Sequence, residues 1–242
     1  QKVHLIQETV PTASWKLVVT YDDSRAREIY EDFGCFRRDV WLYPAKDLLF
    51  YSADIHGNLI TRQRLQVLRH LMEDATGIVV TTLDGLMDRL LPLWQLKNQI
   101  MTVKMGQELD LNQWKERLTR MGYERTGQVD GMGQFSIRGG ILDIFPLTEE
   151  QPIRIELWDT EVDSIRTFDL ESQRSIEQLE ETEIYPASEL VLTEDQRKEG
   201  AERIRKEAKA SVENLRRQML TEEAHRLQGI AQELAEGIQE GL

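Results

Sequence analysis

The first hundred residues alternate between short apolar runs and amphipathic segments. The apolar runs predict strands at Trp15–Thr20, Asp39–Tyr43 and Gly77–Thr82. The first and third runs lack polar alternation, which is typical of strands buried on both faces. Helical spacing predicts helices from a cap at Asp22, Asp23 or Ser24 to about Phe33, from Leu59 or Ile60 to Met72, and over Leu83–Leu90. Strands that alternate with helices predict βαβ units and a parallel sheet.

The pattern changes near Ile100, where strand-type runs follow one another closely. A strand is predicted over Ile100–Lys104, and an amphipathic helix capped by Asp110 over Leu111–Met121. Breaks at Gly139-Gly140, at 146–152 and at the acidic turn near Asp159 predict hairpins of a small antiparallel sheet. Its runs are Gln134–Ile137, Ile141–Phe145, Ile153–Trp158 and Ser164–Phe168, and a closing run follows near Glu183–Tyr185. We interpret this region as an α+β domain inserted into the first domain.

The run Ile153–Trp158 carries the most information about function. Side chains alternate between the two faces of a strand, so Ile153, Ile155 and Leu157 form an apolar face. Arg154, Glu156 and Trp158 then point to the opposite face. Arg and Trp are over-represented among the residues that dominate protein–protein binding energy. Alternatively, Trp158 packs under a neighbouring loop and Arg154 pairs with a local carboxylate, and the alternation alone does not choose between the two.

Residues 193–242 carry two helical patterns. Thr193 is a candidate cap for the first. The apolar positions at three- and four-residue steps are Ile204, Ala208, Val212, Leu215 and Met219, followed by Leu227, Ile230, Leu234 and Ile238. We interpret these segments as solvated helices that pack one stripe on the first domain. Gln1–Val10 has the pattern of the end of a helix.

Several motifs resemble one known family. They are RGGILDIFP at 138–146, PIRIELWDTEVDSIRTFD at 152–169 and Gln173-Arg174-Ser175. The order of arginines, glycines, Pro146 and the acidic turn resembles the UvrB-homology region at the N-terminus of the bacterial transcription-repair coupling factors, and the excision-repair protein UvrB has a more diverged version. Weaker matches are Tyr43-Pro44-Ala45, Asp54, Arg62, Arg64 and the run 77–82.

The resemblance implies a fold and a partner. The expected fold is α/β, with a degenerate P-loop-NTPase-like parallel sheet domain, an inserted small α+β domain with an antiparallel sheet, and C-terminal helices. Residues 1–100 and 187–242 would form the degenerate nucleotide-binding domain, and 101–186 the inserted UvrA-binding domain. The UvrA-contacting residues that it implies are Arg138, Arg154 and Trp158, although the family commonly has Phe where Trp158 stands.

Composition and charge narrow the range of possible functions. The chain has 242 residues, 40% hydrophobic and 30% charged, and a formal net charge of −13. Ile141–Glu194 holds fifteen Asp and Glu against three Arg and no Lys, a local balance of −12. An acidic surface repels phosphate backbones, so this region favours a protein partner over DNA. The single Cys35 and the lack of a long apolar run or secretory signal pattern predict a cytoplasmic protein.

Catalytic and cofactor motifs are missing from the sequence. A phosphate-binding loop of the G-x-x-x-x-G-K-[ST] type needs a Gly-Lys pair, which does not occur. Gly139-Gly140 is more simply a turn or bulge that reorients Arg138. The four histidines have no Ser or Cys partner in an obvious triad, and Asp54 with His56 offers two metal ligands at most. We therefore expect no catalytic residue, cofactor or metal in this fragment.

Direct DNA binding by the fragment is also disfavoured. Arg62, Arg64 and Arg69 lie on one predicted helix and Arg37-Arg38 near a strand, positions that more often form solvated faces. UvrB-like proteins grip DNA with an aromatic-rich hairpin after the Tyr-Pro strand. Here the segment 46–57 is short and offers only Phe50 and Tyr51.

The leading hypothesis is a non-catalytic module that recruits UvrA and so links stalled RNA polymerase to nucleotide excision repair. The whole protein would then be an ATP-dependent DNA translocase that contacts RNA polymerase and DNA through other regions. The alternative is a fragment of a UvrB-like or helicase-like ATPase whose phosphate loop lies upstream of Gln1. A structural scaffold with no partner is a third interpretation.

Overall fold

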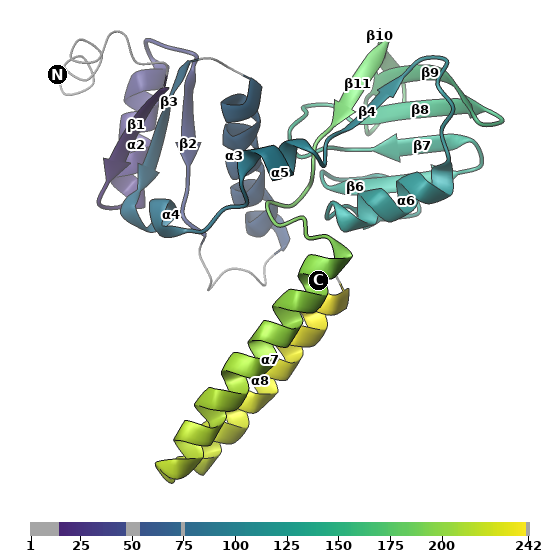
Figure 1. Cartoon of the computed structure of the whole chain (residues 1–242). Coiled ribbons are helices and arrows are strands. Elements are labelled where there is room, and N and C mark those ends of the chain that lie inside the picture. Colours follow the sequence, from purple (N-terminus) through teal and green to yellow (C-terminus); the bar gives the residue numbers. More distant parts are fainter. Residues whose placement is uncertain (1–14, 47–53, 74–75, 241–242) are drawn as a thin grey trace. The chain divides into compact units, whose positions relative to one another are not determined.

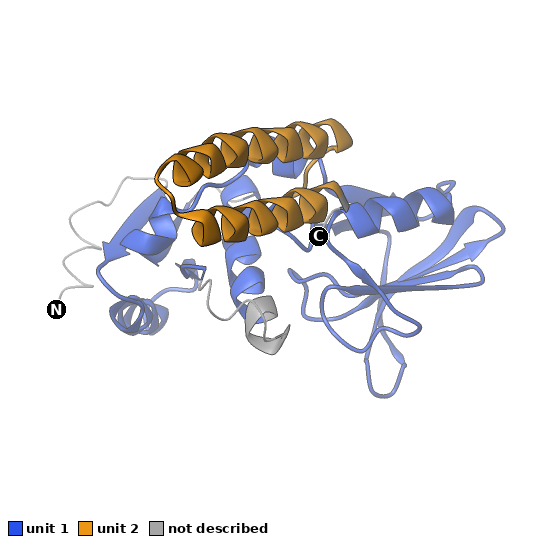
Figure 2. Ribbon diagram, turned by 90° about the horizontal axis from the view of Figure 1, so that it is seen from below, with its two compact units in different colours: residues 1–190 blue, residues 191–242 orange. Residues whose placement is uncertain are grey.

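The computed structural model describes residues 15–46, 54–73 and 76–240, with the side chains of 54–58 and 240 excepted. The patterns at Gln1–Val10, Phe50 and Tyr51, and the candidate ligands Asp54 and His56, lie outside these described parts. The chain forms two compact units, Gln1–Leu190 and Val191–Leu242, shown in blue and orange in Figure 2. The described residues of the first unit form two larger sheets and a two-stranded one (Figure 1).

The parallel sheet consists, among the described residues, of β1 (Trp15–Thr20), β2 (Val40–Tyr43) and β3 (Gly77–Thr82) in the order β1-β3-β2. Both neighbouring pairs are parallel, which confirms the predicted βαβ arrangement. Central β3 is buried throughout, as predicted. The prediction that β1 is buried on both faces is wrong, since Leu17 and Val19 are 55% and 42% exposed. In the described part of the chain β1 pairs only with β3 and is an edge strand.

The helices of this part differ from the predictions mainly at their ends. α2 (Asp23–Gly34) begins as predicted, because the side chain of Asp22 accepts the backbone N–H of Arg25 at 2.7 Å. α3 (Asp54–Glu73) begins before the predicted start. α4 (Leu83–Met87) is shorter than predicted, and α5 (Leu93–Lys97) was not predicted.

Gly77 begins β3 where two indole rings meet. A Cβ added at Gly77 would lie 2.2 Å from the ring of Trp41 and 2.4 Å from that of Trp15. We expect Gly77→Ala to lower the free energy of unfolding by about 1–3 kcal/mol, because the rings must move out of a packed position. Gly34→Ala is the control, since nothing lies within 4 Å of its added Cβ. Equal unfolding midpoints in urea for the two variants would contradict this packing.

The second sheet, which we call the hairpin sheet, follows in the chain. Among the described residues its strand order is β10-β9-β8-β7-β6-β5, and its pairs are antiparallel except for β5 with β6. The predicted hairpins are thereby confirmed, while β5 and β10 were not predicted. The strands are β5 (Glu124–Arg125), β6 (Gln134–Arg138), β7 (Ile141–Ile144), β8 (Ile153–Trp158), β9 (Glu161–Phe168) and β10 (Ser175–Leu179). Separately, β4 (Met101–Lys104) pairs antiparallel with β11 (Glu181–Ile184).

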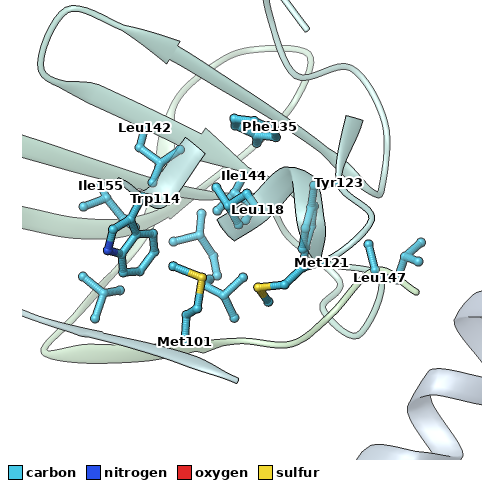
Figure 3. Close-up of a cluster of buried hydrophobic side chains, with 14 of the residues drawn as sticks. Met101, Trp114, Leu118, Met121, Tyr123, Phe135, Leu142, Ile144, Leu147 and Ile155 are labelled. Atoms are coloured by element: carbon cyan, nitrogen blue, oxygen red, sulfur yellow. The ribbon is translucent and has the colours of Figure 1, made fainter. Parts of the chain in front are cut away.

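One face of the hairpin sheet builds the main core of the unit. α6 (Leu111–Arg120), capped by Asp110 as predicted, places Trp114 and Leu118 against Leu142 and Ile155 of the sheet (Figure 3). Met101, Met121, Tyr123 and Ile144 fill the space around them (Figure 3). Burial of apolar surface stabilises a folded chain by about 25 cal/mol per Å². This core therefore holds in place the sheet that carries the candidate site.

Helix α3 contributes to the cores of both sheets. Val67 packs with Tyr43 and Val79 of the parallel sheet. Leu65 and Leu68, each 3% exposed, belong to the main core with the hairpin sheet and α6. Figure 1 shows α3 between the two sheets. The two sheets are therefore linked through a shared helix within the first unit.

The second unit is a pair of helices, α7 (Glu194–Arg217) and α8 (Thr221–Glu240), that pack along each other. Thr193 caps α7 as predicted, in a reciprocal capping box with Gln196. The predicted apolar stripe is partly wrong: Val212 is buried, but Met219, Leu234 and Ile230 are 89%, 55% and 45% exposed. The buried positions of α8 are instead Ala224, Ala231 and Ala235. The predicted packing on the first domain, and the predicted domain boundaries, stay predictions. None of the described helices is long and apolar enough to cross a membrane.

Candidate protein-binding site

The candidate site lies on the face of the hairpin sheet that is turned away from the main core, which we call the outer face. Its charged and aromatic side chains include Arg138, Asp143, Arg154, Glu156, Trp158 and Arg166, and strand pairing places Glu161 opposite Trp158. The alternation predicted for β8 is confirmed, because Ile153 and Ile155 are 2% and 0% exposed in the core. Strand pairing places Asp143 beside Arg154, and Arg154 beside Arg166.

Trp158 is the exposed aromatic residue of this region. Its side chain ends β8 and is 81% exposed. The following turn, Asp159-Thr160, returns the chain to β9, and Asp159 has a φ of 57°, a left-handed conformation that Asp tolerates. The alternative in which Trp158 packs under a neighbouring loop is therefore wrong.

Arg154 lies in a network of local contacts. Its Nε donates to Asp143 Oδ1 at 2.6 Å, and its Nη2 donates to Asp143 Oδ2 at 2.9 Å and to Gln173 Oε1 at 2.8 Å. The guanidinium also lies 4.3 Å from the centre of the Phe168 ring. The hydrogen bonds to Asp143 raise the pKa of Arg154, so it stays charged. The alternative in which Arg154 pairs with a local carboxylate is confirmed, and 16% of its side chain remains exposed.

Arg138 ends β6 and is the more accessible of the two arginines. Its side chain is 48% exposed, and its Nη2 donates to Asp143 Oδ2 at 3.0 Å. The predicted turn at Gly139-Gly140 follows directly, with Gly139 at a φ of 60°. Leu157 N donates to Gly140 O at 2.8 Å, so this turn lies against β8 next to Trp158. The structure thus brings the turn, Arg138 and the end of β8 together.

Two members of the outer face were missed in the sequence. Asp143 is 1% exposed and accepts hydrogen bonds from both Arg138 and Arg154. Its position in the alternating run Ile141–Phe145, opposite to Leu142 and Ile144, is the signal that could have indicated it. Arg166 forms an ion pair with Glu156, which also accepts a hydrogen bond from Ser164 at 3.0 Å.

Four of the arginines considered for DNA form ion pairs within the fold, whereas Arg38 is exposed. The prediction of a solvated face is wrong for Arg64, which is 0% exposed. Arg62 pairs with Glu150 at 2.6 Å, and Arg69 pairs with Glu149 at 2.5 Å. Arg37 pairs with Asp39 and lowers the pKa of that carboxyl group. These side chains therefore join parts of the fold to one another.

A search of the described side chains finds no group of three or more His, Cys, Asp or Glu residues that could hold a metal ion. Burial raises the pKa of Tyr43 and of Tyr123, and the Tyr123 hydroxyl donates to Tyr185 O at 2.5 Å. The outer face can offer charge, hydrogen-bond donors and an aromatic ring to another protein.

Comparisons with known proteins find relatives over most of the chain. Residues 101–190 match the family model of the UvrB interaction domain. The chain is 36% identical over 218 residues to the transcription-repair-coupling factor of Staphylococcus aureus strain Mu50, which is 89% of this chain and 18% of that protein. It is 37% identical over 201 residues to the transcription-repair-coupling factor of Bacillus subtilis strain 168, 82% of this chain and 17% of that protein.

The chain spans less than a fifth of the length of the curated relatives that it matches. Arg138, Arg154 and Trp158 all lie within the matched residues 101–190. The resemblance found in the sequence is thereby confirmed, and the chain belongs to the family of the transcription-repair coupling factors as a segment that contains a UvrB interaction domain.

Proposed function

We propose that this chain is a non-catalytic module that recruits UvrA and thereby couples stalled RNA polymerase to nucleotide excision repair. The sequence similarity to transcription-repair coupling factors supports a role in transcription-coupled repair. The match to the UvrB interaction domain supports a protein-binding role for residues 101–190. Within that region, the outer face of the hairpin sheet is the proposed UvrA-binding surface.

The observation that carries the proposal is the exposure of Trp158. A side chain of this size that is 81% exposed leaves an apolar area in water that a partner can bury. Arg138, 48% exposed, lies on the adjoining edge, held near β8 through the contact of Gly140 with Leu157. An aromatic anchor beside an arginine is the composition typical of binding hot spots.

The surrounding charge favours a protein partner. Ile141–Glu194 carries a balance of −12, from fifteen acidic residues and three arginines. Nucleic-acid phosphates are repelled by such a surface, whereas a protein can meet the local arginines with its own carboxylates. The proposed surface is therefore a small basic and aromatic area within an acidic domain.

We propose no cofactor for this fragment. Its parallel sheet would be a nucleotide-binding fold of the P-loop type that has lost its site. The whole protein would be a cytoplasmic, ATP-dependent DNA translocase that contacts RNA polymerase and DNA through other regions. The ATPase-fragment alternative has no supporting observation in the described residues.

The test of the proposal is co-elution of this chain with UvrA in size-exclusion chromatography. We expect a complex, because Trp158 and Arg138 are accessible in the folded chain. A titration with ATP and Mg²⁺ serves as the control, and we expect no saturable binding in the micromolar range. Separate elution of the two proteins at micromolar concentrations would contradict UvrA recruitment, and micromolar ATP affinity would favour the ATPase alternative.

A further inference from the structure

Asp143 is a buried carboxylate that the proposed binding residues share. It lies on the outer face of the hairpin sheet. It is nevertheless only 1% exposed, because the two arginines cover it. Its Oδ2 accepts from both Arg138 Nη2 at 3.0 Å and Arg154 Nη2 at 2.9 Å, and its Oδ1 accepts from Arg154 Nε at 2.6 Å. Charge-assisted bonds of this kind hold a guanidinium in one orientation.

We infer that Asp143 is a positioning residue for UvrA binding, which orients Arg138 and Arg154 so that their remaining donors face a carboxylate of the partner. This inference rests on the proposed function of the same surface. Asp143 itself, being covered, would not touch the partner.

The ion pairs of the outer face support a carboxylate as the group that is recognised. Three arginines, Arg138, Arg154 and Arg166, face two carboxylates, Asp143 and Glu156. Asp143 compensates one of its two arginines, and Glu156 pairs with Arg166. Within these ion pairs one positive charge is left over, and an acidic side chain from outside can pair with it.

The two arginines have different parts in this arrangement. Arg154 is 16% exposed and uses Nε and Nη2 for Asp143 and Gln173, so among the contacts of the described residues its Nη1 is the nitrogen left for a partner. Arg138 is 48% exposed and uses one nitrogen, Nη2, for Asp143. Arg138 therefore reaches towards the partner, while Arg154 is anchored from two sides.

Fixing these side chains before binding increases affinity. A free arginine has many rotamers, and a complex must immobilise them at a cost in free energy. Asp143 and Gln173 restrict Arg154 already in the unbound chain, and Asp143 restricts Arg138. Asp143 also removes one unit of positive charge, which lowers electrostatic attraction at a distance. Loss of the Asp143 carboxylate should therefore speed the dissociation of UvrA without slowing its association.

The test is the affinity and kinetics of UvrA binding for Asp143→Asn, in the wild-type chain and in Arg138→Ala. In the wild-type background we expect an affinity loss of about ten-fold, carried by faster dissociation. In Arg138→Ala we expect a loss of about three-fold or less, because one of the two positioned side chains is gone. The matched control is Asp163→Asn, which removes the same charge from an exposed position on β9 and should leave affinity unchanged.

A purely structural role would produce equal fold-changes in both backgrounds, and this result would overturn the inference. Tighter binding by Asp143→Asn would also overturn it, since Asp143 would then compete with the partner for the arginines. Should that variant not fold, Gln173→Ala replaces it and removes the other anchor of Arg154. We expect about three-fold weaker binding by Gln173→Ala, and unchanged affinity would count against positioning. A wild-type chain that does not bind UvrA would contradict the proposed function itself.

Discussion

We expect Arg64→Ala to lower the free energy of unfolding by about 3–5 kcal/mol, as when one partner is removed from a buried ion pair. Arg64 is 0% exposed in α3, and its Nε and Nη2 donate to the two carboxylate oxygens of Glu189 at 2.6 and 3.0 Å. Its Nη1 donates to Pro44 O at 2.7 Å and to Asp88 at 2.9 Å, and the group lies 4.1 Å from the centre of the Tyr43 ring. Its removal leaves Glu189, 6% exposed, with Lys46 at 3.3 Å as the remaining cation.

Urea denaturation followed by tryptophan fluorescence measures this effect. Arg120→Ala is the control, because Arg120 is 56% exposed and lies 3.7 Å from Glu116, a surface pair worth about 0–1 kcal/mol. The double variant Arg64→Met with Glu189→Leu should recover much of the loss, because it leaves neither charge buried alone. A loss below about 1 kcal/mol for Arg64→Ala would contradict the structural role of this network.

Local patterns were enough to predict the elements that carry the candidate site. The period-2 alternation in Ile153–Trp158 placed Ile153 and Ile155 in the core and Trp158 outside, and both placements are confirmed. The cap at Asp110 and the turn at Gly139-Gly140 were predicted from residues within a few positions of each feature. These features depend on residues that are close in sequence, so a single sequence is enough to predict them.

The features that the sequence did not predict depend on contacts between residues that are far apart in the chain. Arg64 was interpreted as part of a solvated face, but its partner Glu189 lies 125 residues later in the chain. Strand β1 was interpreted as buried on both faces, because the apolar run Trp15–Thr20 does not indicate its edge position among the described strands. In the helical pair, Ala231 and Ala235 are buried, whereas the neighbouring Ile230 and Leu234, predicted as the apolar stripe, are exposed.

Arg154 shows which contacts of a binding residue cannot be predicted from the sequence. The alternation correctly placed it away from the core, but its contact with Asp143 depends on the register of β7 with β8. Because Arg154→Ala would also remove a partner of the buried Asp143, its effect combines binding with local stability. Trp158 offers the cleaner substitution.

We expect Trp158→Ala to weaken UvrA binding by about 2 kcal/mol or more, close to a thirty-fold rise in Kd. The ring is 81% exposed in the free chain, so its truncation removes little internal packing. The free energy of unfolding should change by less than about 0.5 kcal/mol, as is typical of surface positions. Loss of binding with unchanged stability would therefore assign Trp158 to the interface.

The most direct measurement is the Kd for UvrA of three chains, the wild type, Trp158→Ala and Trp94→Ala, by isothermal titration calorimetry. Trp94 is also exposed, at 66%, but lies on α5, outside the matched residues 101–190. We expect Trp158→Ala to bind at least about thirty-fold more weakly than the wild type, and Trp94→Ala to bind as the wild type does. Wild-type affinity of Trp158→Ala would contradict the placement of the UvrA-binding surface on the outer face of the hairpin sheet.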